Sequence, residues 1–79
     1  MKTTSIQYAV VIEKSDTGYS AYPPDLPGCG VTARTLEEAE RLIREAIEFH
    51  IEGLLRHGEP VPEPTSHCEY VEATITQPG

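Results

Sequence analysis

The side chains that could take part in catalysis are a scattered set of acids, histidines and cysteines. Metal-dependent hydrolysis needs several carboxylates that converge on Mg²⁺. The segments with strand-like patterning supply Glu13, Glu69 and Glu72, and the loops add Asp16 and Asp25. The three glutamates lie near predicted strand ends or on an outward face, so the sequence predicts no carboxylate cluster and no enzymatic activity.

The sulfur and imidazole groups do not form a metal motif either. A site built from Cys29, Cys68, His57 and His67 would draw its ligands from three segments, and neither C-x-x-C nor H-x-x-x-H spacing occurs. We therefore expect two reduced thiols that act as small apolar side chains, with no metal and no cofactor. His50 falls within an apolar helical stripe, where a hydrogen-bonded core residue is the usual interpretation and a ligand role the alternative. There is no G-x-S-x-G and no phosphate-binding glycine loop.

Composition sets wider limits on function. A chain of 79 residues makes one domain, 1–79, with a core expected over 5–75, and so small a core favours a homo-oligomer. Six basic and 13 acidic residues give a net charge of −7, which argues against a surface for nucleic acid and suits either solubility or docking to a basic protein. No apolar run approaches 18 residues, and the first five residues are too few and too polar to form a signal peptide. We therefore expect a cytoplasmic protein that does not enter membranes.

The chain is organised around the segment 18–39. Residues 19–22 have strand composition, and Pro23-Pro24 ends the strand because neither ring nitrogen can donate a hydrogen bond. Residues 25–28 read Asp-Leu-Pro-Gly and predict a turn, in which Leu26 and Cys29 can tuck the loop against the core. Residues 31–34 then predict another strand.

A long helix is expected over residues 36–57. Thr35 and Glu38 form a capping box, in which the Thr35 hydroxyl accepts from the Glu38 amide and the Glu38 carboxylate reaches back to the Thr35 amide. Gly58 is the expected stop. At helical periodicity one apolar stripe emerges, made of Leu36, Ala39, Ile43, Ala46, Ile47, His50 and Leu54.

The outer segments alternate in the manner of strands. Residues 5–13 predict a strand that forms a hairpin with 19–22, residues 59–67 a proline-rich linker, and residues 69–75 a last strand. The expected fold is α+β, in the order β-β-β-α-β: a three-stranded antiparallel meander, one long helix on one face and a fourth strand at an edge. Its core is expected to contain Ile6, Tyr8, Val10, Ile12, Ile43, Ala46, Ile47, Leu54 and Val71.

Several of these motifs follow one another in the order of a known family. The sequence resembles the HicB antitoxins over roughly residues 6–64. The matching positions are Tyr8, Gly18-Tyr19, Pro24-Asp25-Leu26-Pro27-Gly28-Cys29, Thr35, Glu37-Glu38-Ala39, Glu45-Ala46-Ile47, Gly58 and Pro62-Glu63-Pro64. The resemblance implies a partial ribonuclease-H-like fold and an antitoxin that covers the active site of a small basic HicA toxin, an mRNA-cleaving ribonuclease.

This resemblance leaves three functional hypotheses and two candidate surfaces. The chain is either a toxin-binding module, a solitary homo-oligomeric structural module, or a relic hydrolase of the same fold. Family members usually add a C-terminal DNA-binding segment, for which the residues after Pro64 are too few, so we expect no DNA binding. The expected partner-binding residues, exposed on the turn and its flanking strand, are Tyr22, Asp25 and Leu26; the alternative is that the prolines only turn the chain and binding lies on the helix. The expected self-association residues are Ala9, Val11, Leu42 and Phe49.

Overall fold

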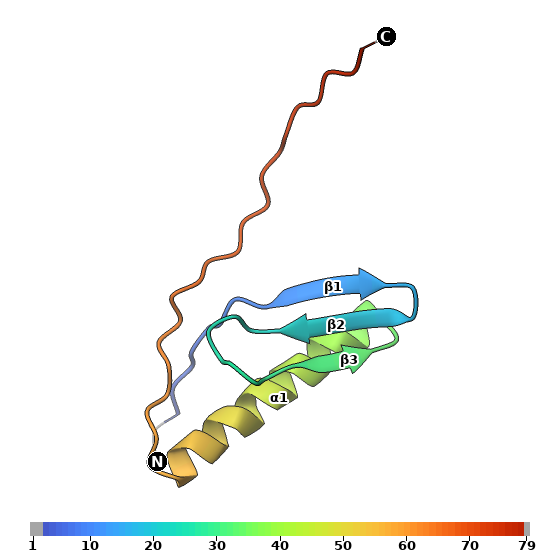
Figure 1. The fold of residues 1–79 in the computed structure, drawn as a ribbon. Helices are drawn as coiled ribbons and strands as arrows, with labels where there is room; N and C mark the ends of the chain where they lie inside the picture. Colours follow the sequence, from blue (N-terminus) through green and yellow to red (C-terminus); the bar gives the residue numbers. More distant parts are fainter. Residues whose placement is uncertain (1–2, 79) are drawn as a thin grey trace.

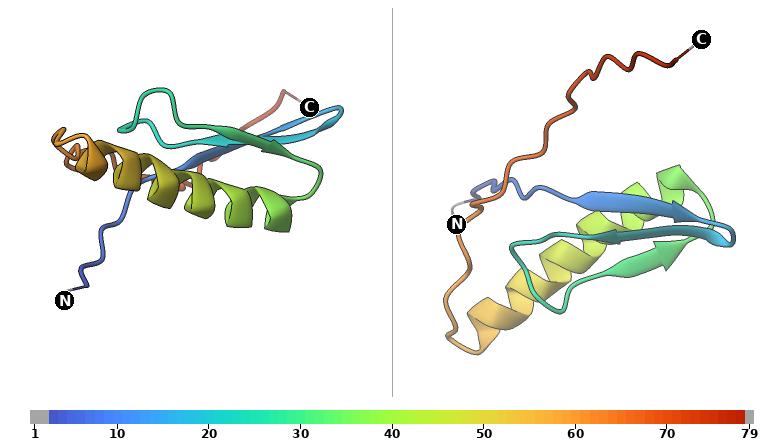
Figure 2. Two further views of the ribbon diagram at one scale, coloured as in Figure 1. Left: turned by 90° about the horizontal axis from the view of Figure 1, so that it is seen from below. Right: turned by 45° about the horizontal axis from the view of Figure 1, so that its top comes forward.

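The computed structural model of this protein describes residues 3–78. Three short strands and one long helix form the fold. The strands are β1 (Val11–Ser15), β2 (Gly18–Tyr22) and β3 (Val31–Ala33), and the helix is α1 (Leu36–Arg56). The sheet has the order β1-β2-β3 with both pairs antiparallel, and α1 lies across one of its faces (Figures 1 and 2). The predicted α+β meander with one helix on one face is therefore confirmed.

The β1–β2 hairpin depends on glycine at position 18. Ser15 pairs with Gly18, which leaves the two residues 16 and 17 as the turn. Gly18 has a φ of +149°, and a Cβ atom there would lie 2.3 Å from the carbonyl oxygen of Ala33. Because β3 ends so close to the start of β2, no residue with a side chain fits here without moving the backbone.

Helix α1 begins at the predicted residue and ends one residue earlier than predicted, at Arg56, and one contact of its N-terminal cap differs. The Thr35 hydroxyl accepts from the Glu38 amide at 3.1 Å, as expected. The Glu38 carboxylate, however, accepts from the amide of Arg34 at 3.0 Å and not from that of Thr35. The C-terminus closes at Gly58, whose φ is +67° and whose amide donates to the Leu55 carbonyl at 3.1 Å. Within residues 3–78, no helix has both the length and the apolarity needed to cross a membrane.

The core lies between the sheet and α1. Ala21, Leu26, Cys29 and Ile43 form its buried centre. Partly buried side chains pack around them, namely Tyr8, Val10, Ile12, Val31, Ala46 and Ile47. Most of the predicted core is therefore confirmed, and Leu54 is half-buried. Ile6 and Val71 were wrongly placed there, because both are exposed.

The first strand begins later than predicted and ends later. It covers residues 11–15 in place of 5–13, and residues 5–10 run without regular secondary structure. The reason lies in the neighbouring strand. Val11 pairs with Tyr22, the last residue of β2, and Pro23 then takes the chain away from the sheet. Residues 5–10 therefore have no ladder partner from β2.

The predicted fourth strand over residues 69–75 is not confirmed. Within the described residues, everything after 58 lacks regular secondary structure, and residues 69–78 leave the body of the molecule (Figure 1). The molecule measures 62 × 27 × 21 Å, and its radius of gyration of 16.2 Å exceeds the roughly 12 Å of a compact domain of this length. Alternating side chains favour a strand, but a strand also needs a neighbour for its backbone groups, which this segment does not meet in a single chain.

Candidate partner-binding surface

The loop between β2 and β3 is held by its own backbone. The Leu26 amide donates to the Pro23 carbonyl at 3.1 Å, and the Cys29 amide donates to the Leu26 carbonyl at 3.2 Å. Gly28 takes a φ of +83°, which closes the second of these turns. Two consecutive turns and three prolines leave the loop, residues 23–29, with little conformational freedom.

Leu26 anchors this loop from below. Its side chain is only 1% exposed and packs in the buried centre of the core, and the Pro23 ring is also fully buried. The expectation that Leu26 is exposed for partner binding is wrong, whereas the expectation that it tucks the loop against the core is right. A branched apolar side chain in a short loop gains more by burial than by exposure. Leu26 therefore positions the loop and does not offer a contact.

Tyr22 is the exposed aromatic residue beside the loop. Its side chain is 41% exposed at the end of β2. Ala21, its neighbour, points into the core, so alternation along the strand places Tyr22 on the sheet face opposite α1. A shallow hollow on that side is lined by Ser20, Ala21, Tyr22, Gly30, Val31 and Thr32. Tyrosine offers a large rigid apolar surface with one polar end, which suits a protein contact.

Within residues 3–78, Asp25 accepts more side-chain hydrogen bonds than any other residue. Its Oδ2 atom accepts from the amides of Thr65 and Ser66, each at 2.9 Å. Its Oδ1 atom accepts from the Thr65 hydroxyl at 3.0 Å and from the Ser66 hydroxyl at 2.9 Å. We call this arrangement the Asp25 clamp. It ties the β2–β3 loop to a segment 40 residues later in the chain.

The clamp favours the charged form of the carboxylate. Hydrogen bonds from the Ser66 amide, and then from the Ser66 hydroxyl and the two Thr65 groups, hold the pKa of Asp25 below its usual value of 3.8. Partial burial of the carboxyl acts in the opposite direction and is outweighed. At neutral pH Asp25 is therefore ionised, with both oxygens occupied by hydrogen bonds.

Two further contacts hold the returning chain against the N-terminal segment. The Tyr8 hydroxyl donates to the Pro62 carbonyl at 2.6 Å, and the Cys68 thiol lies 3.9 Å from the Val10 carbonyl oxygen. Burial raises the pKa of Tyr8, and the negative charges of Glu63 and Asp25 raise it further. The phenol therefore keeps its proton and remains a donor.

Sequence reasoning missed the segment that Asp25 holds. Asp25 was expected to be exposed for partner binding, but its carboxylate accepts from the amides of Thr65 and Ser66, which lie outside the turn. A Thr-Ser pair in a proline-rich linker has no sequence pattern that indicates which group will accept its hydrogen bonds. Tyr8 did have such a signal, because a tyrosine on the core face of a strand needs a hydrogen-bond partner for its hydroxyl.

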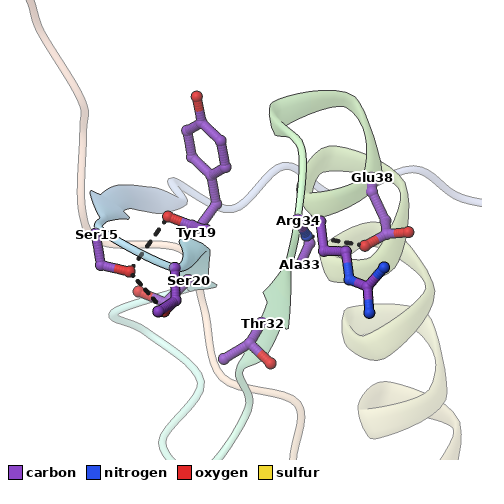
Figure 3. A pocket seen from close by; sticks show the side chains of 9 residues that line it. Ser15, Tyr19, Ser20, Thr32, Ala33, Arg34 and Glu38 are labelled. Atoms are coloured by element: carbon purple, nitrogen blue, oxygen red, sulfur yellow. Dashed lines mark hydrogen bonds between the residues drawn. The ribbon is translucent and has the colours of Figure 1, made fainter.

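A second hollow lies at the other end of the sheet, beside the β1–β2 turn (Figure 3). Its lining is mostly polar: Ser15, Thr17, Gly18, Tyr19, Ser20, Thr32, Ala33, Arg34 and Glu38. The Ser15 hydroxyl donates to the Gly18 carbonyl at 3.3 Å, and the Glu38 carboxylate caps α1 through the Arg34 amide. Among the residues that line this hollow there is no histidine or cysteine, and its one carboxylate, Glu38, already accepts a hydrogen bond from the Arg34 amide.

The four residues expected in self-association lie on two surfaces. Val11 pairs with Tyr22 and so shares the sheet face opposite α1, and both it and Ala9 are half-buried. Leu42 and Phe49 lie on α1, where Leu42 is half-buried and Phe49 is 75% exposed. The structure therefore does not bring the sheet pair and the helix pair together.

The thiols and imidazoles also stay apart. Cys29 is buried and Cys68 is exposed, and burial raises the pKa of the Cys29 thiol. Across residues 3–78, no group of three or more histidine, cysteine, aspartate or glutamate side chains could hold a metal ion. His50 is half-buried on α1.

Comparison with known proteins gives a consistent result. Residues 8–78 match the family model described as the HicB-like antitoxin of bacterial toxin-antitoxin systems. A 14.9 kDa protein from the rep-hol intergenic region of Haemophilus phage HP1 is 42% identical over 64 residues, which cover 81% of this chain and 48% of that protein. The chain therefore spans about half the length of this relative.

Shorter relatives match over more of their own length. A UPF0150 protein of Synechocystis is 47% identical over 71% of this chain and 72% of its own, and one of Thermoplasma acidophilum is 41% identical over 72% and 84%. Among solved structures, a chain of a HicA3 and HicB3 toxin-antitoxin complex superposes with a TM-score of 0.66 and 33% identity, over 76% of this chain and 70% of that one.

Proposed function

This chain belongs to the HicB-like antitoxin family, and from that premise we propose that it neutralises a small basic HicA-like ribonuclease by binding over its active site. The observation that carries the proposal is the likeness to a chain of the HicA3 and HicB3 complex, which at 33% identity covers 76% of this chain. We propose that inhibition works by shape and charge, with no chemistry contributed by this protein.

The charge of the molecule supports such a partner. A net charge of −7 on 79 residues would accelerate encounter with a cationic RNA-binding surface. The effect should weaken as salt rises, because mobile ions screen exposed charges over about 8–10 Å at physiological ionic strength.

Within this proposal, Tyr22 makes the contact and Leu26 and Asp25 support it. Tyr22 is exposed, lies next to a loop that the buried Leu26 holds in place, and borders the shallow hollow on the open sheet face. A loop with little freedom before binding loses little entropy on binding. Asp25, whose oxygens already accept four hydrogen bonds, would contribute through the clamp and not through new bonds to the toxin.

The test is co-expression with the toxin-like product of an adjacent gene, with cell growth and co-purification as readouts. Wild type should restore growth and co-purify. Tyr22→Ala should lose most of the rescue, because an exposed aromatic anchor often contributes about 2 kcal/mol or more at an interface.

Phe49→Ala is the matched comparison, since it removes an aromatic side chain that is exposed on α1. Loss of binding in Phe49→Ala with retention in Tyr22→Ala would move the site to the helix. No complex with any such neighbour would refute the antitoxin function itself.

A further inference from the structure

The C-terminal segment of residues 69–75 has the pattern of a strand and the exposure of a tail. Val71, Ala73 and Ile75 alternate with Tyr70, Glu72 and Thr74. Val71 is 82% exposed and Ile75 is 78% exposed, and Tyr70 is fully exposed. Aromatic and β-branched residues favour strands, and exposing several of them on one segment is costly in water. The segment therefore has the composition of a strand that lacks its neighbour.

The chain is held firmly up to the point where this segment begins. The Asp25 clamp fixes Thr65 and Ser66, and the thiol of Cys68 lies 3.9 Å from the carbonyl oxygen of Val10. The C-terminal residues then run away from the body of the molecule, as Figure 1 and the right-hand view of Figure 2 show. Residues 69–75 thus leave the molecule next to the residue that precedes β1.

The edge of the sheet at β1 can accept a strand. Among the described residues β1 pairs only with β2, so the backbone groups along its other side are not paired in a sheet. Helix α1 packs mainly beneath β2 and β3. The apolar residues on the helix side near β1, Val10 and Ile12, are accordingly only partly buried. A strand added at this edge would extend the sheet and cover them.

We propose that residues 69–75 of one copy add as a strand to the outer edge of β1 in a second copy, and that two copies exchange these segments reciprocally. Seven extended residues cover about 23 Å, enough to run the length of the five-residue β1. Val71, Ala73 and Ile75 would face the helix side and cover Val10 and Ile12. The Asp25 clamp and the Tyr8–Pro62 hydrogen bond direct the segment outwards, and the edge of a second copy can be met without breaking either of them.

The first test measures the mass of the full chain in solution by light scattering, over a range of concentrations. The wild type should give twice 8.7 kDa. The double substitution Val71→Asp, Ile75→Asp should raise the dissociation constant of the dimer by at least about a hundredfold, because it buries carboxylates without partners. Both side chains are exposed in the single chain, so the helical circular dichroism of the variant should not change.

Thr74→Asp is the control for added charge, because it places one carboxylate on the other face of the segment, where the double variant places two on the apolar face. It should leave the dimer in place. A wild type of 8.7 kDa at high micromolar concentration would overturn the proposal. A double variant that remains a dimer would also overturn it, and would assign the contact to another surface such as Phe49 on α1.

The second test distinguishes a partner's edge from the chain's own. In an equimolar mixture of isotope-labelled and unlabelled protein, isotope-filtered nuclear Overhauser spectra should show contacts from Val71 and Ile75 of one chain to Ile12 of the other. Contacts of these residues only within one chain would mean that the segment folds back on its own β1, and would overturn the exchange.

Discussion

Truncating Leu26 to alanine should remove the anchor of the β2–β3 loop. The side chain is 1% exposed and lies in the buried centre of the core with Ala21, Cys29 and Ile43. Buried Leu→Ala substitutions cost about 3–5 kcal/mol, since they lose apolar burial and leave a cavity. A domain of this size has a free energy of unfolding of only about 3–5 kcal/mol from its core alone. The substitution should therefore leave a large fraction of the protein unfolded at 25 °C.

The assay is urea denaturation followed by helical circular dichroism, with protein concentration held constant so that any association affects all samples equally. Leu55→Ala is the matched control, because it makes the same chemical change at a side chain that is 65% exposed. The control should shift the free energy of unfolding by no more than about 0.5 kcal/mol. A loss below about 1 kcal/mol in Leu26→Ala would refute the reasoning that this residue anchors the loop.

Three other results are expected. Gly18→Ala should destabilise the domain by about 1–3 kcal/mol in the same denaturation assay, since its methyl group would lie 2.3 Å from the Ala33 carbonyl oxygen; an equally stable variant would contradict the tight approach of these strands. Cys68 should react with an iodoacetamide probe at least about tenfold faster than buried Cys29 in the native protein, and the two rates should converge in urea. Because the pKa of Asp25 is lowered on folding, the stabilisation from the clamp should be fully present above pH 3.8 and be lost as the pH falls through the lower pKa of the folded state. Amide shifts at the two clamped residues, followed by NMR, should report that loss in the wild type and show an open clamp at neutral pH in Asp25→Ala.

Helix α1 and strands β2 and β3 could be predicted from sequence because their signals are local. Thr35 and Gly58 mark the ends of α1 through hydrogen bonds to residues within one turn. The strand at residues 18–22 is bounded by a hairpin turn before it and by Pro23 after it. Such signals act between neighbours in the chain, so reading them requires no knowledge of the fold.

Strand β1 and the strand expected over residues 69–75 were predicted less well, because pairing with distant residues decides where a strand begins and ends. Residues 5–10 alternate more clearly than residues 11–15, yet only residues 11–15 face a paired strand, since β2 ends at Tyr22. Residues 69–75 carry the same alternation and find no edge within one chain. Side-chain periodicity reports which residues would share a face, while pairing depends on where other segments end.

The candidate surface shows the same division. The exposure of Tyr22 could be predicted from its place at a strand end next to rigid turn residues. Leu26 lies only four residues later but is buried, because the loop turns its side chain towards the core. The partners of Asp25 lie 40 residues later and could not be found from any local pattern.

The Asp25 clamp connects the two proposals. One carboxylate fixes the loop beside Tyr22 and also the segment from which residues 69–75 depart. Its oxygens accept four hydrogen bonds within the chain, so an approaching toxin would gain little from this group unless the clamp opened. Removing the carboxylate should therefore affect toxin binding and strand exchange together, whereas Tyr22→Ala should affect toxin binding and leave the dimer intact. An Asp25→Ala variant that loses toxin binding while its dimer is unchanged would mean that Asp25 contacts the toxin directly.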